Sequence, residues 1–457
     1  MDTRTDVLVI GGGPGGVMAA MSAARYNPDM RVMLVKREDD SIVPCGIPYI
    51  FGTLHAVEKD LAALGPLRQL GVKVVVATVT EVDKDAHTAT LDDGPTIHWR
   101  KLILATGSSP VIPDIPNIGL AGIFTINKSF DYLADLFENE LGRPRRLVIL
   151  GGGFIGIEFC DECRKAGHEV AVVEMNKHCL ERNLDPHICQ RIERKLHERG
   201  VKVFTGTEVT RFHGHQRVEF VELGDGTMVP ADIVLVAVGQ RRNSELAQSI
   251  GLSMKAFGSI WVDNFQCTSH PDIFAVGDCS HKQDFFSRRG IHTLLASVAA
   301  AEGRIAGRNL FTRQSLRFSS GTISIYATCL DDLAFGIAGL TESAAREAGL
   351  NVVMGEATLP DRHPPTMPGM TMMTCLLTFC AQGGTLVGGQ VVGGPTTGEV
   401  LNAIGIAIQS KLTADELLSF QFGSHPRLTA PVHPIVAATE DALQHWGMVR
   451  TPLERCA

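Results

Sequence analysis

The feature that most constrains the fold is a glycine turn placed between two short apolar runs. The runs at 6–10 and 31–35 are predicted strands, and the Ala-rich stretch between them is a predicted helix. Gly11, Gly13 and Gly16 have the G-x-G-x-x-G spacing of a dinucleotide-binding turn. The first glycine permits the tight turn, the second lets the backbone approach a pyrophosphate, and the third lets helix and strand pack closely. The unit therefore predicts a Rossmann-like α/β domain.

The same unit occurs again 140 residues further along the chain. After a second apolar run, Gly151, Gly153 and Gly156 repeat the spacing, and a helical stretch leads to the strand-like run at 168–174. Two such units predict two bound dinucleotides. The alternative, one degenerate copy that binds nothing, fits less well because both copies keep all three glycines.

The residue that ends the second strand differs between the two copies. In the second copy it is Glu174, a carboxylate placed to accept hydrogen bonds from a ribose 2′-hydroxyl. A carboxylate there repels a 2′-phosphate, so NADH is expected rather than NADPH. In the first copy the aligned residue is Lys36, and two ribose contacts stay open: Lys36 donates to the ribose, or Glu38 reaches it.

Three further predicted strands end in short turns of mostly small residues. The first turn is Ala105, Thr106 and Gly107, before the second glycine unit. After that unit, the segment ADIVLVAVG ends in the same way at Gly239, and FQCTSHPDIFAVGD ends at Asp278. Strand ends of this kind lie at the edge of a parallel sheet where ligands bind.

The chain has 457 residues, which is too long for one hydrophobic core and suits two or three domains. From about residue 319 the glycine fingerprints stop. Predicted strands and then helical patterns follow, in an antiparallel α+β layout. This last part is expected to serve oligomerisation, substrate binding or both.

Composition and charge narrow the class of protein. A net charge of −8 argues against a nucleic-acid-binding protein. The charged N-terminus does not resemble a signal peptide, and no uninterrupted apolar run reaches the ~18 residues of a membrane span. The eleven cysteines follow no disulfide framework, so we expect reduced thiols and a cytoplasmic location.

Taken together, these segments resemble the FAD-dependent pyridine nucleotide–disulfide oxidoreductases. The resemblance rests on the two glycine units, the ATG turn at Thr106, and the stretch from Thr268 to Asp278, in that order. It implies FAD at the first turn and NAD(P)H at the second, with Asp278 at the ribityl chain and the backbone near Val79 at the adenine. It also implies a homodimer with a discontinuous FAD domain (1–115 and 245–318), an inserted NAD(P)H domain (116–244) and a C-terminal dimerisation domain (319–457).

Within that family, the segment SIVPCGIPYI (41–50) is similar to the single-cysteine branch. That branch contains coenzyme A-disulfide reductases, NADH oxidases and peroxidases, and persulfide or sulfur reductases. Two-cysteine members carry C-x-x-x-x-C, whereas Ile50 stands five residues after Cys45 in this chain. The resemblance implies that electrons pass from the nicotinamide through the flavin to Cys45. The oxidised sulfur would be a mixed disulfide, a persulfide or a sulfenic acid.

Local chemistry supports a reactive thiol at Cys45. Pro48 suits the first turn of a helix, and a thiol at a helix N-terminus has a lowered pKa. The thiolate would attack a small disulfide RSSR, release RS⁻ and leave Cys45–S–S–R. The alternative is a buried and inert cysteine, which is a common role for this residue.

A leaving thiolate needs a proton, and the resemblance implies that a partner's C-terminal domain supplies it. Coenzyme A-disulfide reductases use tyrosines there, but the last tyrosine of this chain is Tyr326. The stretch HPRLT, which begins at His425, is similar to the HP-x-x-S/T segment of two-cysteine reductases, where the histidine is the acid–base group. An imidazole suits that role, although a capping or surface histidine fits the same stretch. His433 is a weaker candidate.

Five further cysteines have simpler interpretations. Cys160 and Cys163 share a helix face, and we expect core thiols rather than a redox or metal pair, since no second pair lies nearby. Cys375 and Cys380 are five apart in a predicted strand, which puts them on opposite faces. Cys456, at the C-terminal end, is expected to be incidental rather than redox-active.

The leading hypothesis is a homodimeric flavoenzyme that takes hydride from NADH and reduces a small disulfide, persulfide or polysulfide at Cys45. A near alternative uses the same sulfur as a sulfenic acid and reduces peroxide or oxygen. A second alternative is an electron-transfer subunit that reduces a protein partner and does not need Cys45. A third is a nucleotide-sensing scaffold without enzymatic activity.

Overall fold

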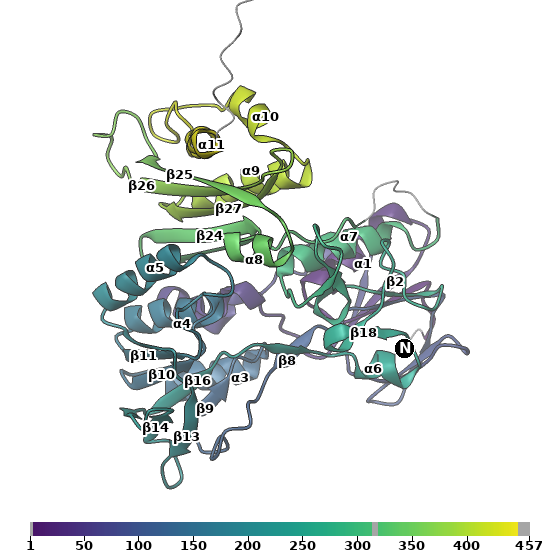
Figure 1. Cartoon of the computed structure of the whole chain (residues 1–457). Coiled ribbons are helices and arrows are strands. Elements are labelled where there is room, and N and C mark those ends of the chain that lie inside the picture. The colour runs from purple at the N-terminus through teal and green to yellow at the C-terminus, as the bar shows by residue number, and fades with distance from the viewer. Residues whose placement is uncertain (1–2, 313–318, 447–457) are drawn as a thin grey trace, which may run out of the picture.

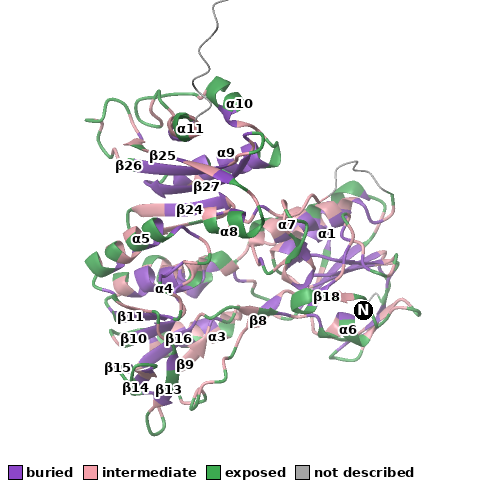
Figure 2. Cartoon of the chain, viewed as in Figure 1, coloured by how far each residue is buried: buried purple, intermediate pink, exposed green. Residues whose placement is uncertain are grey.

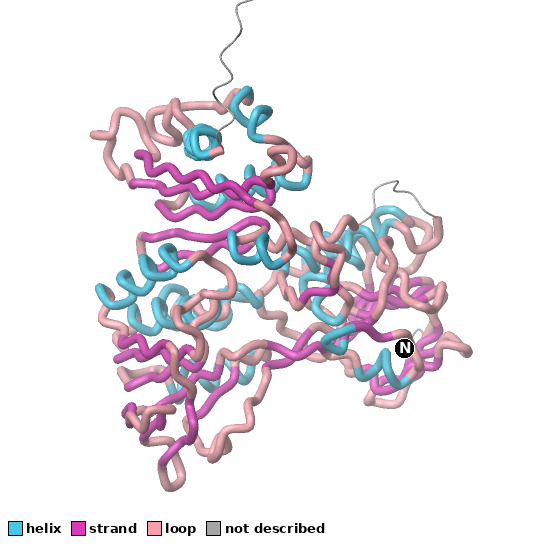
Figure 3. The backbone as a smooth tube through the Cα atoms, in the orientation of Figure 1, coloured by secondary structure: helices cyan, strands magenta, loops and turns pink. Residues whose placement is uncertain are grey.

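The computed structural model describes residues 3–312 and 319–446, which form three units, each built on a five-stranded sheet (Figure 1). Two sheets are parallel and the third is antiparallel, which confirms the predicted fold class of two Rossmann-like units and an α+β domain. Figure 3 shows the strands in magenta, with helices in cyan beside them. The central strands of the two parallel sheets are almost wholly buried, because their apolar runs are covered on both faces (Figure 2). Among the described residues, none of the helices has the length and apolar content needed to cross a membrane.

The first parallel sheet has the strand order β20-β7-β1-β2-β3. Its edge strand β20 comes from much later in the chain than the other four strands, so this unit is discontinuous. Helices α1 and α7 pack closely because Gly303 has no side chain. A Cβ there would lie only 2.5 Å from the carbonyl oxygen of Gly15. The unit comprises β1 (Val7–Ile10), α1 (Pro14–Tyr26), β2 (Val32–Lys36), α2 (Gly65–Gln69), β3 (Lys73–Val76), the antiparallel β4 (Val79–Asp83), β5 (Thr88–Leu91) and β6 (Thr96–His98), then β7 (Lys101–Leu104), α6 (Glu245–Ser249), β18 (Met254–Lys255), β19 (Ser259–Ile260), β20 (Ile273–Ala275), β21 (Lys282–Gln283), β22 (Gly290–Ile291) and α7 (Ala296–Arg308).

The second parallel sheet has the order β12-β11-β10-β16-β9 and uses one continuous stretch of chain. Its central strands pair as in the first unit: β10 lies between β11 and β16, as β1 lies between β2 and β7. The unit comprises β9 (Ile123–Thr125), α3 (Phe130–Asp135), β10 (Arg146–Leu150), α4 (Phe154–Lys165), β11 (Glu169–Glu174), α5 (Pro186–Glu198), β12 (Lys202–Thr205), the antiparallel β13 (Val209–His213), β14 (Phe220–Leu223) and β15 (Met228–Pro230), and β16 (Ile233–Val236).

Two short strands connect these units, and they run side by side. The chain leaves the first unit through β8 (Ser108–Pro110) and returns through β17 (Gln240–Arg242), and the two strands pair antiparallel (Figure 1). The second unit is therefore inserted into the first. The boundaries at 115/116 and 244/245 lie just beyond these strands and stay predictions.

The third sheet is antiparallel, with the order β23-β24-β27-β26-β25. Helix α11, which the sequence analysis did not identify, packs against β25 because Gly355 leaves room for its backbone: a Cβ there would lie 2.0 Å from the carbonyl oxygen of Ala438. Cys375 is buried, and Cys380, the last residue of its strand, is partly exposed. The elements are β23 (Tyr326–Leu330), β24 (Leu333–Gly339), α8 (Glu342–Glu347), β25 (Val352–Pro360), β26 (Met372–Cys380), β27 (Leu386–Gly393), α9 (Thr397–Gln409), α10 (Ala414–Ser419) and α11 (Pro434–His445).

Candidate active site

A large cavity of about 2260 Å³ has walls from both parallel-sheet units and from the start of β23. Both glycine turns, Cys45, Lys36 and Glu174 line it. A pocket for one small ligand usually has a volume of roughly 300–1,000 Å³. The cavity therefore has room for two dinucleotides.

The first glycine turn has the geometry that a pyrophosphate needs. Gly11 has a φ of +117°, and a Cβ there would lie 2.1 Å from the carbonyl oxygen of Ala105. A Cβ on Gly16 would lie 1.9 Å from the carbonyl oxygen of Gly11, so this glycine lets α1 pack against the turn. Nothing lies within 4 Å of a Cβ on Gly13, which precedes the 13-residue helix α1. Open space at a helix N-terminus suits an anionic group.

The second turn repeats this arrangement. Gly151 has a φ of +108°, and a Cβ there would lie 2.6 Å from the carbonyl oxygen of Ala237. A Cβ on Gly156 would lie 1.9 Å from the carbonyl oxygen of Gly151, and nothing lies within 4 Å of one on Gly153. Both turns thus leave the same open space for an anionic group. In each turn, a side chain at the third glycine would clash with the carbonyl oxygen of the first.

The strand ends beside the two turns make different contacts. Glu174 is 8% exposed, and its carboxylate accepts hydrogen bonds from the backbone N–H of Gly152 at 2.8 Å and of Asn176 at 2.8 Å. Lys36 is 4% exposed, and its ammonium donates to the carbonyl of Asp39 at 2.5 Å and to the hydroxyl of Ser41 at 2.7 Å. Burial lowers the pKa of Lys36.

Glu38, the alternative ribose contact of the first unit, also lines the cavity. Its carboxylate accepts a hydrogen bond from the backbone N–H of Phe130, at the start of α3, at 3.1 Å. Both Glu38 and Lys36 are thus held by groups of the protein, and the choice between them stays open.

The other expected cofactor contacts also line the cavity. Asp278 accepts a hydrogen bond from Ser108 at 2.7 Å, and the ammonium of Lys128 lies 3.6 Å from its carboxylate. Thr106 donates to the backbone carbonyl of Asn243 at 2.5 Å, which ties the ATG turn to the returning strand. The cavity wall includes Val79, Ala105, Thr106, Gly107, Gly239 and Asp278.

Cys45 is exposed and lines the cavity, but its local structure differs from the expectation. It lies within the three-residue 3-10 helix η1 (Pro44–Gly46), and the π-helix η2 (Ile50–Leu54) starts only after Pro48. The expected lowering of its pKa is wrong. Partial burial of the thiol raises its pKa, and the carboxylates of Glu158 and Asp60 raise it further. The ammonium of Lys128 acts in the opposite direction.

The two candidate histidines do not meet Cys45 within one chain. His425 is exposed on a turn of the C-terminal domain, where its Nδ1 accepts a hydrogen bond from the backbone N–H of Arg427 at 3.3 Å. His433 caps α11 and stacks on Phe422 with ring centroids 4.0 Å apart. Burial lowers the pKa of His433 to about 4, which makes it a poor proton donor near neutral pH.

Sequence analysis missed two cavity residues that lie near Cys45 or the second turn. Glu158, the fifth residue of α4, accepts a hydrogen bond from Thr328 at 2.6 Å, and burial raises its pKa. Tyr326 stacks on Phe154, with ring centroids 5.1 Å apart and an interplanar angle of 1°. The only available signal was that Glu158 and Phe154 follow the second glycine turn, since Tyr326 reaches the site through the tertiary fold.

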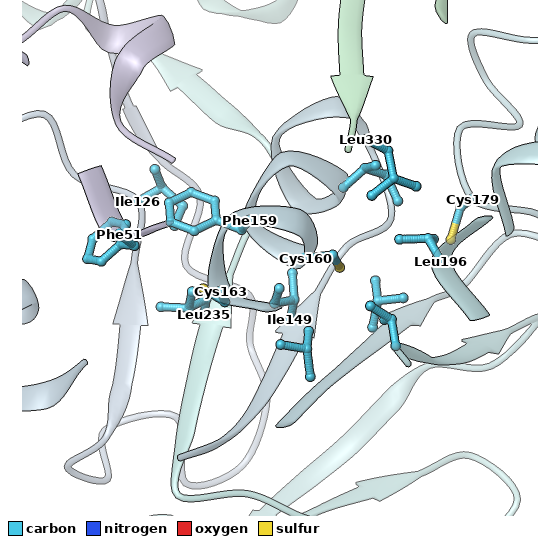
Figure 4. Close-up of a cluster of buried hydrophobic side chains, with 14 of the residues drawn as sticks. Phe51, Ile126, Ile149, Phe159, Cys160, Cys163, Cys179, Leu196, Leu235 and Leu330 are labelled. Atoms are coloured by element: carbon cyan, nitrogen blue, oxygen red, sulfur yellow. The ribbon is translucent and has the colours of Figure 1, made fainter. Parts of the chain in front are cut away.

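The two cysteines of α4, Cys160 and Cys163, lie in the core of the second unit. Cys160 and Cys163 are fully buried beside Phe159, among aliphatic side chains (Figure 4). Burial raises the pKa of both thiols, as expected for inert core cysteines. Within residues 3–312 and 319–446, no cluster of three His, Cys, Asp or Glu is arranged to hold a metal ion. Cys456 lies outside the described residues.

Comparison with known proteins agrees with this arrangement. The chain matches the family described as pyridine nucleotide-disulphide oxidoreductase over residues 5–303, and that family's dimerisation domain over residues 325–434. It is 30% identical over 446 residues to an NADH oxidase of Methanocaldococcus jannaschii, covering 96% of this chain and 98% of the relative. It is 31% identical over 370 residues to an NAD(P)H sulfur oxidoreductase (CoA-dependent) of Pyrococcus abyssi, covering 79% and 82%.

Among solved structures, an NAD-dependent persulfide reductase from A. fulgidus superposes with a TM-score of 0.90 at 28% identity, covering 96% of this chain and 83% of that one. The similarity thus extends over both glycine turns and the C-terminal domain. This chain therefore belongs to the pyridine nucleotide-disulphide oxidoreductase family and is a flavoprotein oxidoreductase that uses FAD and NAD(P)H.

Proposed function

We propose that this enzyme uses NADH to reduce a small disulfide, persulfide or polysulfide at Cys45. The observation that carries the proposal is that Cys45 lies exposed on the wall of the cavity that both glycine turns line. The names of the Pyrococcus abyssi and A. fulgidus relatives support this class of acceptor. A cytoplasmic location fits free thiols such as Cys45, Cys160 and Cys163, which suit a reducing compartment.

The residues present fit both cofactors. The open backbone at Gly13 and the N-terminus of α1 would hold the pyrophosphate of FAD, and Asp278 and Val79 line the same cavity. Gly153 and the N-terminus of α4 would hold the pyrophosphate of NADH, and Glu174 would accept from its ribose. When bound, FAD accepts hydride from NADH and supplies electrons for disulfide reduction.

The protein's own chemistry centres on one sulfur. The Cys45 thiolate attacks RSSR, the bond between the substrate sulfurs breaks, and RS⁻ leaves as Cys45–S–S–R forms. Two electrons then break the mixed disulfide, and the overall change is NADH + H⁺ + RSSR → NAD⁺ + 2 RSH. The dimerisation domain supports a homodimer in which His425 of a second copy protonates the leaving thiolate.

A second function is favoured by the relative from Methanocaldococcus jannaschii, which is named NADH oxidase. In that case the Cys45 thiolate attacks hydrogen peroxide, forming Cys45–SOH and releasing hydroxide, and two electrons restore the thiolate. Both functions need Cys45. A third function, electron transfer to a protein partner, does not.

Turnover of NADH by the flavin-loaded enzyme, with coenzyme A disulfide, polysulfide, hydrogen peroxide or air as acceptor, separates these functions. Cys45→Ser should lower disulfide and polysulfide turnover by at least about 100-fold, yet NADH should still bleach the flavin. Cys380→Ser, a partly exposed thiol in the C-terminal sheet, is the matched control and should retain activity.

The mass of the isolated oxidised protein identifies the species stored on the sulfur. A coenzyme A adduct or an extra sulfur atom on Cys45 would support the proposal, and an added oxygen would favour the oxidase. Full turnover by Cys45→Ser with a protein acceptor would overturn both.

A further inference from the structure

A buried carboxyl group lies directly against the turn that carries Cys45. Asp60 is 5% exposed and ends the 3-10 helix η3 (Val57–Asp60). A Cβ on Gly46 would lie 1.7 Å from Oδ1 of Asp60. The carboxyl group thus occupies the space where any other residue at 46 would place its side chain, which explains the glycine next to Cys45.

Backbone hydrogen bonds hold the two segments together on both sides of this contact. The N–H of Val43 donates to the carbonyl of Asp60 at 2.9 Å, and the N–H of Ala62 donates to the carbonyl of Ser41 at 2.7 Å. Ile42 and Leu61 form an antiparallel bridge between them. The backbone therefore holds the residue that carries the carboxyl group next to the Cys45 turn.

One oxygen of the Asp60 carboxyl group lacks a hydrogen-bond partner in the described structure. Its Oδ2 is buried and has no hydrogen-bond partner among the described residues, whereas most buried polar atoms have one. Burial raises the pKa of Asp60 to about 6. The titratable or charged residues of the packed elements are Glu58 and Lys59 on η3, His55 after η2, and Asp131 and Asp135 on α3. None of them forms an ion pair with Asp60 in the described structure, and the ammonium of Lys59 donates to the carbonyl of Leu54 at 2.8 Å instead.

The surroundings of Cys45 make a nearby negative charge important. Besides Asp60, the carboxylates of Glu158 on α4 and Asp278 on the 3-10 helix η6 (Gly277–Cys279) face the thiol, and Lys128 is the cation that opposes them. Asp60 is not part of the cavity wall, so it acts on the sulfur through charge and backbone position, without touching substrate.

We propose that Asp60 is a positioning residue for Cys45: its carboxyl group supports the Cys45 turn through Gly46 and, once ionised, disfavours the thiolate. The two groups then titrate as a coupled pair, so that formation of the thiolate favours protonation of Asp60. The importance of this pair for turnover rests on the proposed function of Cys45. Its existence does not, because the reactivity of the thiol is measured directly.

The coupling has a pH signature that a purely structural role lacks. Below pH ~5 the carboxyl group is protonated in the wild type, so Asp60→Asn should alkylate at Cys45 at the wild-type rate. Above pH ~7 the carboxylate is present, and Asp60→Asn should react at least about threefold faster, because one nearby negative charge is gone. The ratio of the two rates should rise around pH 6, the pKa of Asp60.

The experiment measures the rate of iodoacetamide addition to Cys45 between pH 4.5 and 8, by mass spectrometry of the Cys45 peptide from the folded, reduced holoenzyme. Glu58→Gln is the matched control, since it removes an exposed carboxylate two residues away on the same 3-10 helix. Its rates should equal those of the wild type at every pH.

The wild type alone gives a second test if Asp60→Asn does not fold. Its logarithmic pH–rate profile should rise with a slope below one around pH 6, because the carboxylate forms in that range as the thiolate does. A slope of one throughout, or a pH-independent ratio between variant and wild type, overturns the proposal. So does an equal rate increase in Glu58→Gln. A shifted thiol reactivity in an enzyme whose turnover ignores Cys45 would support the pairing and refute the proposed function instead.

Discussion

The two glycine turns share their backbone and differ in what stands behind them. The second glycine of each fingerprint has nearly the same conformation, with φ −75° and ψ −179° at Gly13 and φ −76° and ψ −177° at Gly153. In both turns a Cβ on the third glycine would lie 1.9 Å from the carbonyl oxygen of the first. Both units therefore have the same turn geometry.

The residues at the strand ends, Glu174 and Lys36, make different contacts in the two units. In the second unit the Glu174 carboxylate accepts from the backbone of its own turn at Gly152. In the first, the stem of Lys36 packs on Gly12, and its ammonium holds the loop at Asp39 and Ser41, four residues before Cys45. The glycines provide the same turn geometry in both, whereas the first unit uses its strand end to hold the loop that precedes Cys45.

The largest expected effect breaks one turn and spares the other. Gly16→Ala places a methyl group against the Gly11 carbonyl and should yield protein without flavin. Gly156→Ala does the same against Gly151, and should keep the flavin absorbance but lower NADH-dependent turnover by at least about 100-fold. Flavin content and rapid-mixing reduction by NADH measure both. Equal flavin loss in the two variants would contradict separate sites.

A smaller effect is expected from the second strand end. Glu174→Ala removes the acceptor expected for the ribose and should raise the KM for NADH by at least about tenfold, because a charged hydrogen bond is lost. The KM for NADPH should stay the same or fall, since no carboxylate then opposes the 2′-phosphate. Steady-state kinetics with both nucleotides check this, and an unchanged NADH preference would count against Glu174.

The first strand end is expected to affect stability more than cofactor binding. Lys36→Met keeps the stem that packs on Gly12 but removes the bonds to Asp39 and Ser41, and should cost about 1–2 kcal/mol in free energy of unfolding. Urea denaturation and the rate of FAD release measure the two properties. Faster FAD release would instead assign the ribose contact to Lys36, and Glu38→Gln tests the other alternative in the same way.

The smallest effect contrasts two carboxyl groups. One oxygen of Asp60, beside the Cys45 turn, has no hydrogen-bond partner among the described residues, whereas Glu174 at the second glycine turn accepts two backbone hydrogen bonds. The pKa of Asp60 is raised to about 6 in the folded protein, so the folded state binds more protons than the unfolded state between pH ~4 and 6. Stability should therefore fall as pH rises through this range. Asp60→Asn should gain about 1 kcal/mol at pH 7, after allowance for solvent screening, and nothing at pH 4.

The control for this last effect is Glu174→Gln. Its carboxylate is hydrogen-bonded by backbone N–H groups, so the variant should lose stability at pH 7. Thermal or urea unfolding at both pH values gives the comparison. A gain in both variants, or a gain for Asp60→Asn that does not depend on pH, would show that the two carboxyl groups do not differ in this way.

Much of the fold could be predicted because its signals are local. A parallel strand buried on both faces reads as a short apolar run, and the close contacts at Gly16 and Gly156 admit glycine alone, so both units could be identified from the residues. The antiparallel strands of the C-terminal domain were also found, but α11 was not, because its packing depends on Gly355 from a distant strand.

The site was predicted less completely, for the same physical reason. Cys45, Glu174 and Asp278 follow strands or turns whose local pattern names them, and all three line the cavity. Tyr326 and Lys128 reach the cavity from segments that carry no motif. The pKa of Cys45 was predicted in the wrong direction, because it depends on burial and on Glu158 and Asp60 rather than on the helix turn nearby.

The sequence by itself determined that this chain binds two dinucleotides with glycine turns and presents one thiol in a Pro-Cys-Gly turn. Those properties follow from backbone conformations that only a few residue types permit. The tertiary structure decided which side chains surround that thiol and what charge they bring to it. Charges act through space across segments far apart in sequence, and burial exists only once the chain has folded.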